Sequence, residues 1–138
     1  MTAMPPESFV PAADARPAVA QPGATARRDS SALAARWGAI HEAAAVVAAL
    51  AGRSCDAPGT HVRGFPAAIF QAGGQRLMIA RQGMEDLSVM LETGIRALLS
   101  VHGRGASPVA AAEALWGEFC AARDALVALA PPERRLLG

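Results

Sequence analysis

The sequence predicts an all-α protein, an antiparallel bundle of three long helices that follows a disordered N-terminal tail. Three observations predict this fold. Apolar residues recur in steps of three and four in three separate segments, which is the spacing of one helix face. Prolines, glycines and capping residues separate these segments. No segment shows the alternation of apolar and polar residues that a half-buried strand would have.

The predicted tail covers residues 1–29. Proline recurs there every few residues and blocks a continuous helix. Few apolar side chains besides Phe9 and Val10 could enter a core, so we expect this segment to be disordered. The predicted organisation is therefore this tail, a helical domain over residues 30–132, and a short C-terminal tail over residues 133–138.

The first helix is expected to begin at Asp29, Ser30 and Ser31, whose oxygens can cap a first turn. Its apolar stripe comprises Leu33, Trp37, Ile40, Ala44, Val47 and Ala51. Gly52 suits the position just beyond a helix C-terminus. Residues 53–64, which include proline and glycine, are expected to form a loop.

The second helix is predicted to run from Pro66, a residue suited to the first helical position, to about Val101 or His102. Its stripe comprises Leu77, Ala80, Met84, Leu87, Leu91, Gly94 and Leu98. Each glycine in a helix costs about 1 kcal/mol relative to alanine. Adjacent Gly73-Gly74 is therefore the favoured break point, rather than Gly83, and a break there would give a fourth, short helix.

The third helix is predicted to open at Ser107-Pro108, with serine as the cap, and to end at Pro131-Pro132. The short turn before it makes the second and third helices antiparallel neighbours. Across the three helices, the residues expected to be most buried are Trp37, Ile40, Val47, Leu87, Leu91, Trp116, Phe119 and Leu126.

Composition narrows the classes of function. The net charge is +1 and the arginines are scattered, so no nucleic-acid partner is expected. The start of the chain lacks the features of a secretory signal, and the longest uncharged apolar run, Ala43–Gly52, is too short to span a bilayer. Cys55 and Cys120 show no metal-ligand spacing and are expected to be reduced thiols. A cytoplasmic protein is therefore expected.

No set of residues has the spacing of a catalytic or metal site. No Glu stands three residues before His41, His61 or His102, as a helical Glu-x-x-His metal motif requires. His61 and His102 fall in or beside predicted loops, and whether they approach each other stays open. Neither cysteine has an activating neighbour, and Glu85-Asp86 is typical of a solvated face. We therefore expect no enzyme activity, metal or cofactor.

The helix surfaces themselves are the remaining functional feature. Alanines widen the apolar stripes, and three such helices are expected to expose apolar surface when they fold alone. The predicted association surface lies on the second helix and comprises Leu77, Met84, Leu87, Met90, Leu91 and Leu98. A homo-oligomer is the expected outcome.

Residues 66–132 resemble the phasins, bacterial proteins that coat polyhydroxyalkanoate storage granules. The resemblance lies in amphipathic helices that contain alanine and glutamine, such as Gln71–Gln75 and Ala80–Leu87, followed by a turn and a helix of the kind in Ser107–Trp116. It implies a non-enzymatic, oligomeric, granule-associated helical protein. An oligomeric scaffold or partner-binding bundle, and a bundle that binds a small ligand or metal, are the alternatives.

Overall fold

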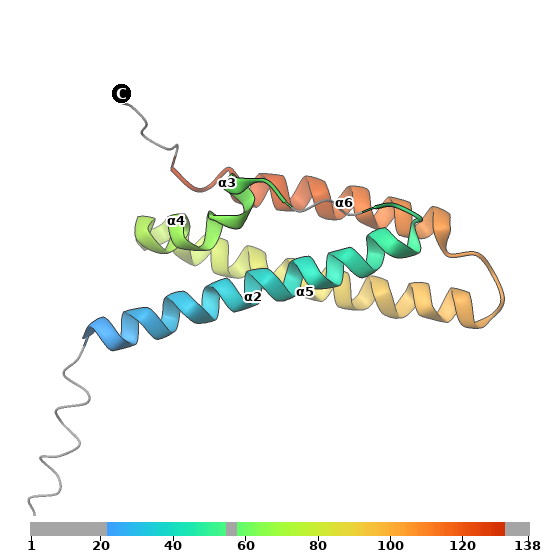
Figure 1. Cartoon of the computed structure of the whole chain (residues 1–138), viewed down its shortest axis with the longest axis horizontal. Coiled ribbons are helices and arrows are strands. Elements are labelled where there is room, and N and C mark those ends of the chain that lie inside the picture. The colour runs from blue at the N-terminus through green and yellow to red at the C-terminus, as the bar shows by residue number, and fades with distance from the viewer. Residues whose placement is uncertain (1–21, 55–57, 132–138) are drawn as a thin grey trace, which may run out of the picture. The chain divides into compact units, whose positions relative to one another are not determined.

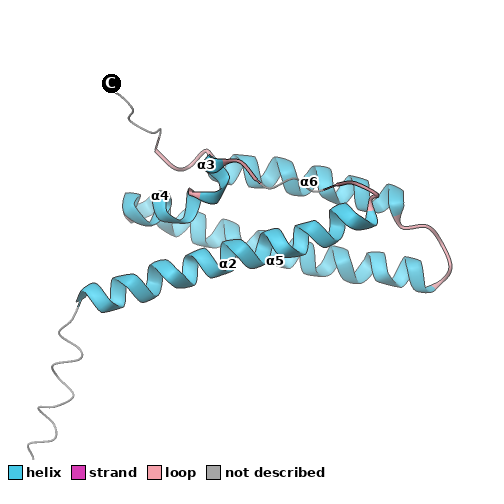
Figure 2. Cartoon of the chain, in the orientation of Figure 1, coloured by secondary structure: helices cyan, strands magenta, loops and turns pink. Residues whose placement is uncertain are grey.

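A computed structural model describes residues 22–54 and 58–131 of the chain. The regular structure of these residues is helical throughout (Figures 1 and 2), which confirms the all-α prediction. The helices are α2 (Pro22–Leu50), α3 (Thr60–Arg63), α4 (Phe65–Ala72), α5 (Gly74–Gly103) and α6 (Val109–Val127). The predicted tails over residues 1–21 and 133–138 lie outside the described residues.

Helix α2 begins seven residues before the predicted cap at Asp29. Its first residue is Pro22, and Ala, Thr and Arg follow without another proline. Proline suits the first helical position, and Ala and Arg are strong helix formers, so the helix continues through Ser30 and Ser31. The expectation of a disordered segment up to residue 29 is therefore wrong for residues 22–29.

The end of α2 is built around Gly52, as the sequence predicts. Gly52 has a φ of +76°, a left-handed conformation that glycine adopts without strain. The Arg53 N–H donates to the Ala48 carbonyl at 2.9 Å, and the Gly52 N–H donates to the Ala49 carbonyl at 3.0 Å. These two bonds form a Schellman motif, which satisfies carbonyls that the helix end leaves open.

The predicted second helix is broken at Gly73-Gly74 into α4 and α5. Gly73 and Gly74 have φ values of +61° and +57°, so both adopt backbone conformations that other residues rarely accept. The Gly73 N–H still donates to the Ile69 carbonyl at 3.1 Å and closes α4. The break at the double glycine is confirmed.

Part of the predicted loop 53–64 is the short helix α3. Its Val62 side chain is 3% exposed, and the Val62 carbonyl accepts a 2.7 Å hydrogen bond from Trp37 Nε1. Nothing in the local sequence signals a helix of four residues. It is held by this contact with α2, which is distant in the sequence.

The chain divides into two compact units, residues 1–32 and 33–138. Within the second unit, α2 from Leu33 onward and α5 run in the same direction, and α6 runs opposite to both (Figure 1). Arg36 of α2 pairs with Glu85 of α5, whereas Arg53 at the other end of α2 pairs with Glu113 near the start of α6.

The first two long helices are therefore parallel, which corrects the expected antiparallel order. The reason is the connection after α2. Val62 lies against Trp37, so the chain returns along α2 before α5 begins. The predicted antiparallel relation between the second and third helices holds for α5 and α6, whose Gly83 and Leu126 are in contact, as are Gly94 and Leu115.

The core contains apolar side chains from α2, α5 and α6. Seven of the eight side chains expected to be buried are 7% exposed or less, namely Trp37, Ile40, Val47, Leu87, Leu91, Phe119 and Leu126. Trp116 is only half-buried, which corrects the prediction for that residue. It packs against the edge of the core, where its ring centroid lies 5.7 Å from that of Phe119.

Candidate association surface

The structure places most of the predicted association surface inside the fold. Four of its six residues, Met84, Leu87, Leu91 and Leu98, are 3% exposed or less, and Leu77 and Met90 are half-buried. The assignment of the first four to a surface is therefore wrong. The physical reason is that a stripe with helical spacing is the face that a helix packs against its own neighbours first.

The exposed apolar side chains of α5 lie beside that stripe. Among the described residues, most of the large hydrophobic side chains with high exposure belong to this helix: Met78 (69%), Ile79 (49%), Val89 (52%) and Leu99 (53%). Leu99 follows the buried Leu98 directly, and Ile79 comes immediately before the buried Ala80. The sequence marks such residues because each stands next to an apolar residue of the buried stripe. Two consecutive apolar residues on a helix cannot both face one core.

A groove of about 470 Å³ separates α2 from α5 on one flank of this helix. Its walls are largely apolar and include Ala39 and Ala43 of α2 and Leu91, Ile95 and Leu99 of α5. The charged residues at its rim, Glu92 and Arg96, bind each other through a 3.0 Å ion pair. The surface of the groove is therefore largely apolar, and the two charged side chains at its rim already neutralise each other.

A second groove, of about 430 Å³, lies between α5 and α6 on the other flank. Ile79, Gly83 and Met90 line it from α5, Ala125 lines it from α6, and Leu129 lines it from just beyond the end of α6. The glycine allows the two helices to approach closely, because a Cβ at position 83 would lie only 2.5 Å from Leu126 Cδ1. The two flanks of α5 are thus both apolar and both open.

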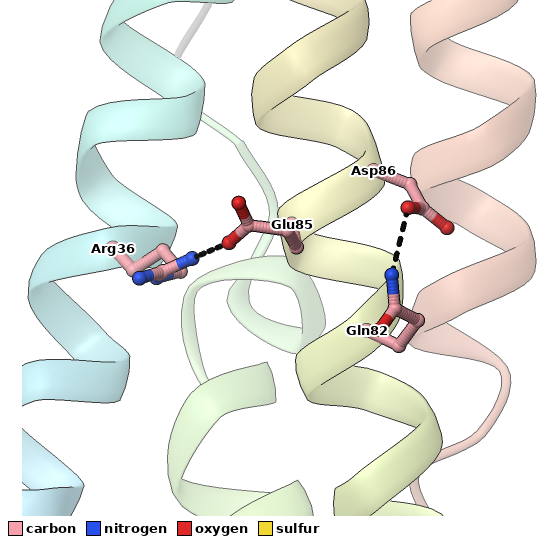
Figure 3. A network of polar contacts seen from close by, with 4 residues as sticks. All are labelled: Arg36, Gln82, Glu85 and Asp86. Atoms are coloured by element: carbon pink, nitrogen blue, oxygen red, sulfur yellow. Dashed lines mark hydrogen bonds and ion pairs between the residues drawn. The ribbon is translucent and has the colours of Figure 1, made fainter.

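The polar side chains around the middle of α5 are satisfied by neighbours rather than gathered into a site (Figure 3). Glu85 points toward α2, where Arg36 donates to it, and Gln82 donates to Asp86 at 3.0 Å. Glu85 and Asp86 therefore have different partners and do not act as a carboxylate pair. Both are exposed, which agrees with the interpretation of a solvated face.

The histidines are dispersed. His61 belongs to α3 and His102 to the last turn of α5, both are exposed, and Figure 1 shows α3 well separated from the end of α5 that leads into α6. The structure therefore does not bring these two residues together. Among residues 22–54 and 58–131, no group of three or more His, Cys, Asp or Glu side chains is arranged to hold a metal ion.

His41 is the histidine that enters the core. Its Nδ1 lies 2.9 Å from the Trp37 carbonyl, and its ring lies edge-on to Trp37 and Phe119, with centroids 4.8 Å and 5.6 Å away. Burial lowers its pKa below the ordinary value of 6.5, and the nearby positive charge of Arg123 lowers this pKa further, against a raising effect of the hydrogen bond to Trp37. The neutral ring is therefore the favoured form at neutral pH.

Of the two cysteines, the structure describes Cys120. Cys55 lies outside the described residues. Cys120 is half-buried and packs against the core next to Phe119, as expected for a small hydrophobic residue on α6.

By length and composition alone, residues 24–50 of α2 could cross a membrane, and they are the one such segment among the described residues. This segment is longer than the uncharged run 43–52, which alone is too short to span a bilayer. The helix buries Trp37, Ile40 and Val47 in the fold, and the core helix of a folded domain meets the same criterion of length and composition.

Comparisons with protein-family models, with curated proteins and with solved structures found no match to this chain.

Proposed function

We propose that this chain is a non-enzymatic helical association protein that self-associates through the two apolar flanks of α5. The observation that supports the proposal is the concentration of exposed large hydrophobic residues on that helix, beside two open grooves. Contiguous exposed apolar surface on a protein is typical of a site of assembly or partner binding.

The grooves suit association energetically. Removing a fully exposed leucine or isoleucine side chain from water contributes roughly 1.5–3 kcal/mol, and a side chain that is about half exposed contributes about half as much. Association at either flank can bury such a side chain, Leu99 on one flank and Ile79 on the other. The rim residues Glu92, Arg96 and Asp86 keep the hydrogen-bond partners that they already have, so no unpaired charge need be buried.

A coat on a hydrophobic surface, such as a storage granule, is the sharper form of this proposal. An oligomeric scaffold would bury the same flanks in a symmetric interface. Both use exposed apolar side chains, and they differ in whether the protein prefers a hydrophobic phase to its own copies. A small-ligand site is less well supported, because the charged side chains of the larger groove bind each other instead of converging on its interior.

Flotation with granules of polyhydroxyalkanoate tests the proposal. The full chain is mixed with granules and centrifuged, and the protein in the granule layer is measured. We expect granule binding by the natural chain and its loss in an Ile79→Glu/Leu99→Glu variant, since a charge at each flank opposes burial. Assembly in solution without granule binding would favour the scaffold. If the natural chain neither bound granules nor assembled in solution, association through α5 would be refuted.

A further inference from the structure

The contact between α2 and α6 contains a titratable side chain at an otherwise aromatic junction. His41 of α2 lies against Phe119 of α6, and Trp37, one turn earlier on α2, lies 4.7 Å from Phe65 of α4 between ring centroids. Arg123 of α6 covers the Phe119 ring at 5.5 Å. The His41 ring therefore stands where α2 meets α6, and any change in its charge acts on that contact.

The hydrogen bond to Trp37 determines the tautomer of the neutral His41 ring. The Trp37 carbonyl can only accept, so Nδ1 carries the proton and donates it. Nε2 is then the nitrogen with a lone pair, and it is buried without a hydrogen-bond partner. Protonation would convert this atom into a buried donor that also lacks a partner, which is the costlier state because it carries charge.

The groups around His41 do not compensate that charge. On α6, Arg123 is positive, and its carboxylate partner Asp124 is exposed. Cys120 of α6, next to Phe119, is half-buried, and Glu42 of α2 is exposed. From α3, the Val62 carbonyl accepts a hydrogen bond from Trp37, and from α4 the Phe65 ring packs against Trp37, so neither residue brings a titratable group to the junction.

We propose that His41 is a pH-sensitive latch between α2 and α6: its neutral ring closes the contact, and its protonation loosens it. The proposal does not depend on association through α5. It stands on the position of the ring between two helices, the unpartnered Nε2 and the facing arginine.

Histidine NMR titration of the full chain tests the latch, together with amide hydrogen exchange corrected for the intrinsic exchange rate. His61→Ala and His102→Ala variants identify the His41 resonance and serve as exposed controls. We expect His41 to titrate below 6.5. Protection of amides in α2 and α6 should fall over the same range, by up to about tenfold for each unit by which the pKa is lowered.

Two further variants separate the latch from general acid sensitivity. His41→Phe keeps an aromatic ring but cannot be protonated, so protection of α2 should no longer depend on pH in this range. Arg123→Gln should move the His41 midpoint upward, because it removes the opposing charge, and it tests the proposal even if His41→Phe does not fold. A His41 midpoint at or above 6.5, or α2 protection that is independent of pH in the natural chain, would overturn the proposal.

Discussion

Leu126 of α6 lies directly over Gly83 of α5, so close that a Cβ at position 83 would come within 2.5 Å of Leu126 Cδ1. The same relation recurs at Gly94, where a Cβ would come within 2.4 Å of Leu115 Cδ2. The glycine that weakens α5 as an isolated helix therefore provides the space into which α6 packs. At these positions, close packing outweighs helix propensity.

Substitution of Gly83 by alanine should cost stability relative to a matched helix glycine. Gly117 of α6 has no atom within 4 Å of where its Cβ would stand, so Gly117→Ala should stabilise by about 0.5–1 kcal/mol. Gly83→Ala must displace Leu126, and overpacking of this kind costs roughly 1–3 kcal/mol. In urea unfolding, the Gly83→Ala variant should therefore have a lower free energy of unfolding than the Gly117→Ala variant. Equal free energies would show that α5 and α6 do not pack this closely.

Two leucines of α5, one buried and one exposed, should respond very differently to truncation. Leu91 is 1% exposed, so Leu91→Ala should lower the free energy of unfolding by roughly 2–5 kcal/mol. Leu99 is 53% exposed, and Leu99→Ala should stay within about 0.5 kcal/mol in dilute solution. A large loss at Leu99 together with a small loss at Leu91 would mean that the buried face of α5 is assigned incorrectly.

The two tryptophans provide a second matched pair. Trp37→Phe removes the buried hydrogen bond to the Val62 carbonyl, at a cost of about 0.5–1.5 kcal/mol. Trp116 is half-buried at the edge of the core, so Trp116→Phe should cost less. Thermal unfolding of both variants gives the comparison, and a smaller loss for Trp37→Phe would argue against the anchoring of α3 on α2.

Stability should depend on pH through His41 in a defined direction. Its pKa is lowered in the folded state, so the unfolded chain binds more protons as the pH falls through the ordinary value of 6.5. The contribution of His41 is therefore fully present above that pH and is lost progressively as the pH falls toward the lowered pKa. Urea unfolding at a series of pH values should show this decline in the natural chain and in His61→Ala, but not in His41→Phe.

The sequence predicts the helical content, the Gly52 end of α2 and the break at Gly73-Gly74 because each depends on local chemistry. Periodic apolar residues and glycine conformations are properties of a few neighbouring residues. The helix α2 starts earlier than the predicted cap, because the helix formers between Pro22 and Asp29 extend it through the two serines that could have capped it. Serine side chains favour a helix start, whereas the residues before them favour continuation of the helix, and the local sequence contains both signals.

The features that the sequence does not predict arise from contacts between distant residues. The parallel direction of α2 and α5 depends on Trp37 holding Val62, which returns the chain along α2. The exposure of Ile79 and Leu99, and the burial of Met84 and Leu91, depend on which side of α5 its neighbours cover. An apolar stripe marks a face that will be covered, and only the packed structure shows whether its own fold or another molecule covers it.

A matched pair of charge substitutions separates association through the flanks of α5 from association through general surface hydrophobicity. Ile79→Glu/Leu99→Glu places one charge in each groove, at residues that are about half exposed and so should not disturb folding. Val109→Glu is the control, since Val109 of α6 is exposed to a similar extent, at 46%, but lines neither groove.

Sedimentation velocity over a series of protein concentrations, with circular dichroism to verify folding, is the most direct test of this claim. We expect the natural chain and Val109→Glu to sediment as concentration-dependent assemblies, and the double variant to sediment as a folded monomer, because an unpaired charge is costly to bury. A natural chain that stays monomeric at every concentration, or a double variant that assembles as the natural chain does, would contradict association through α5.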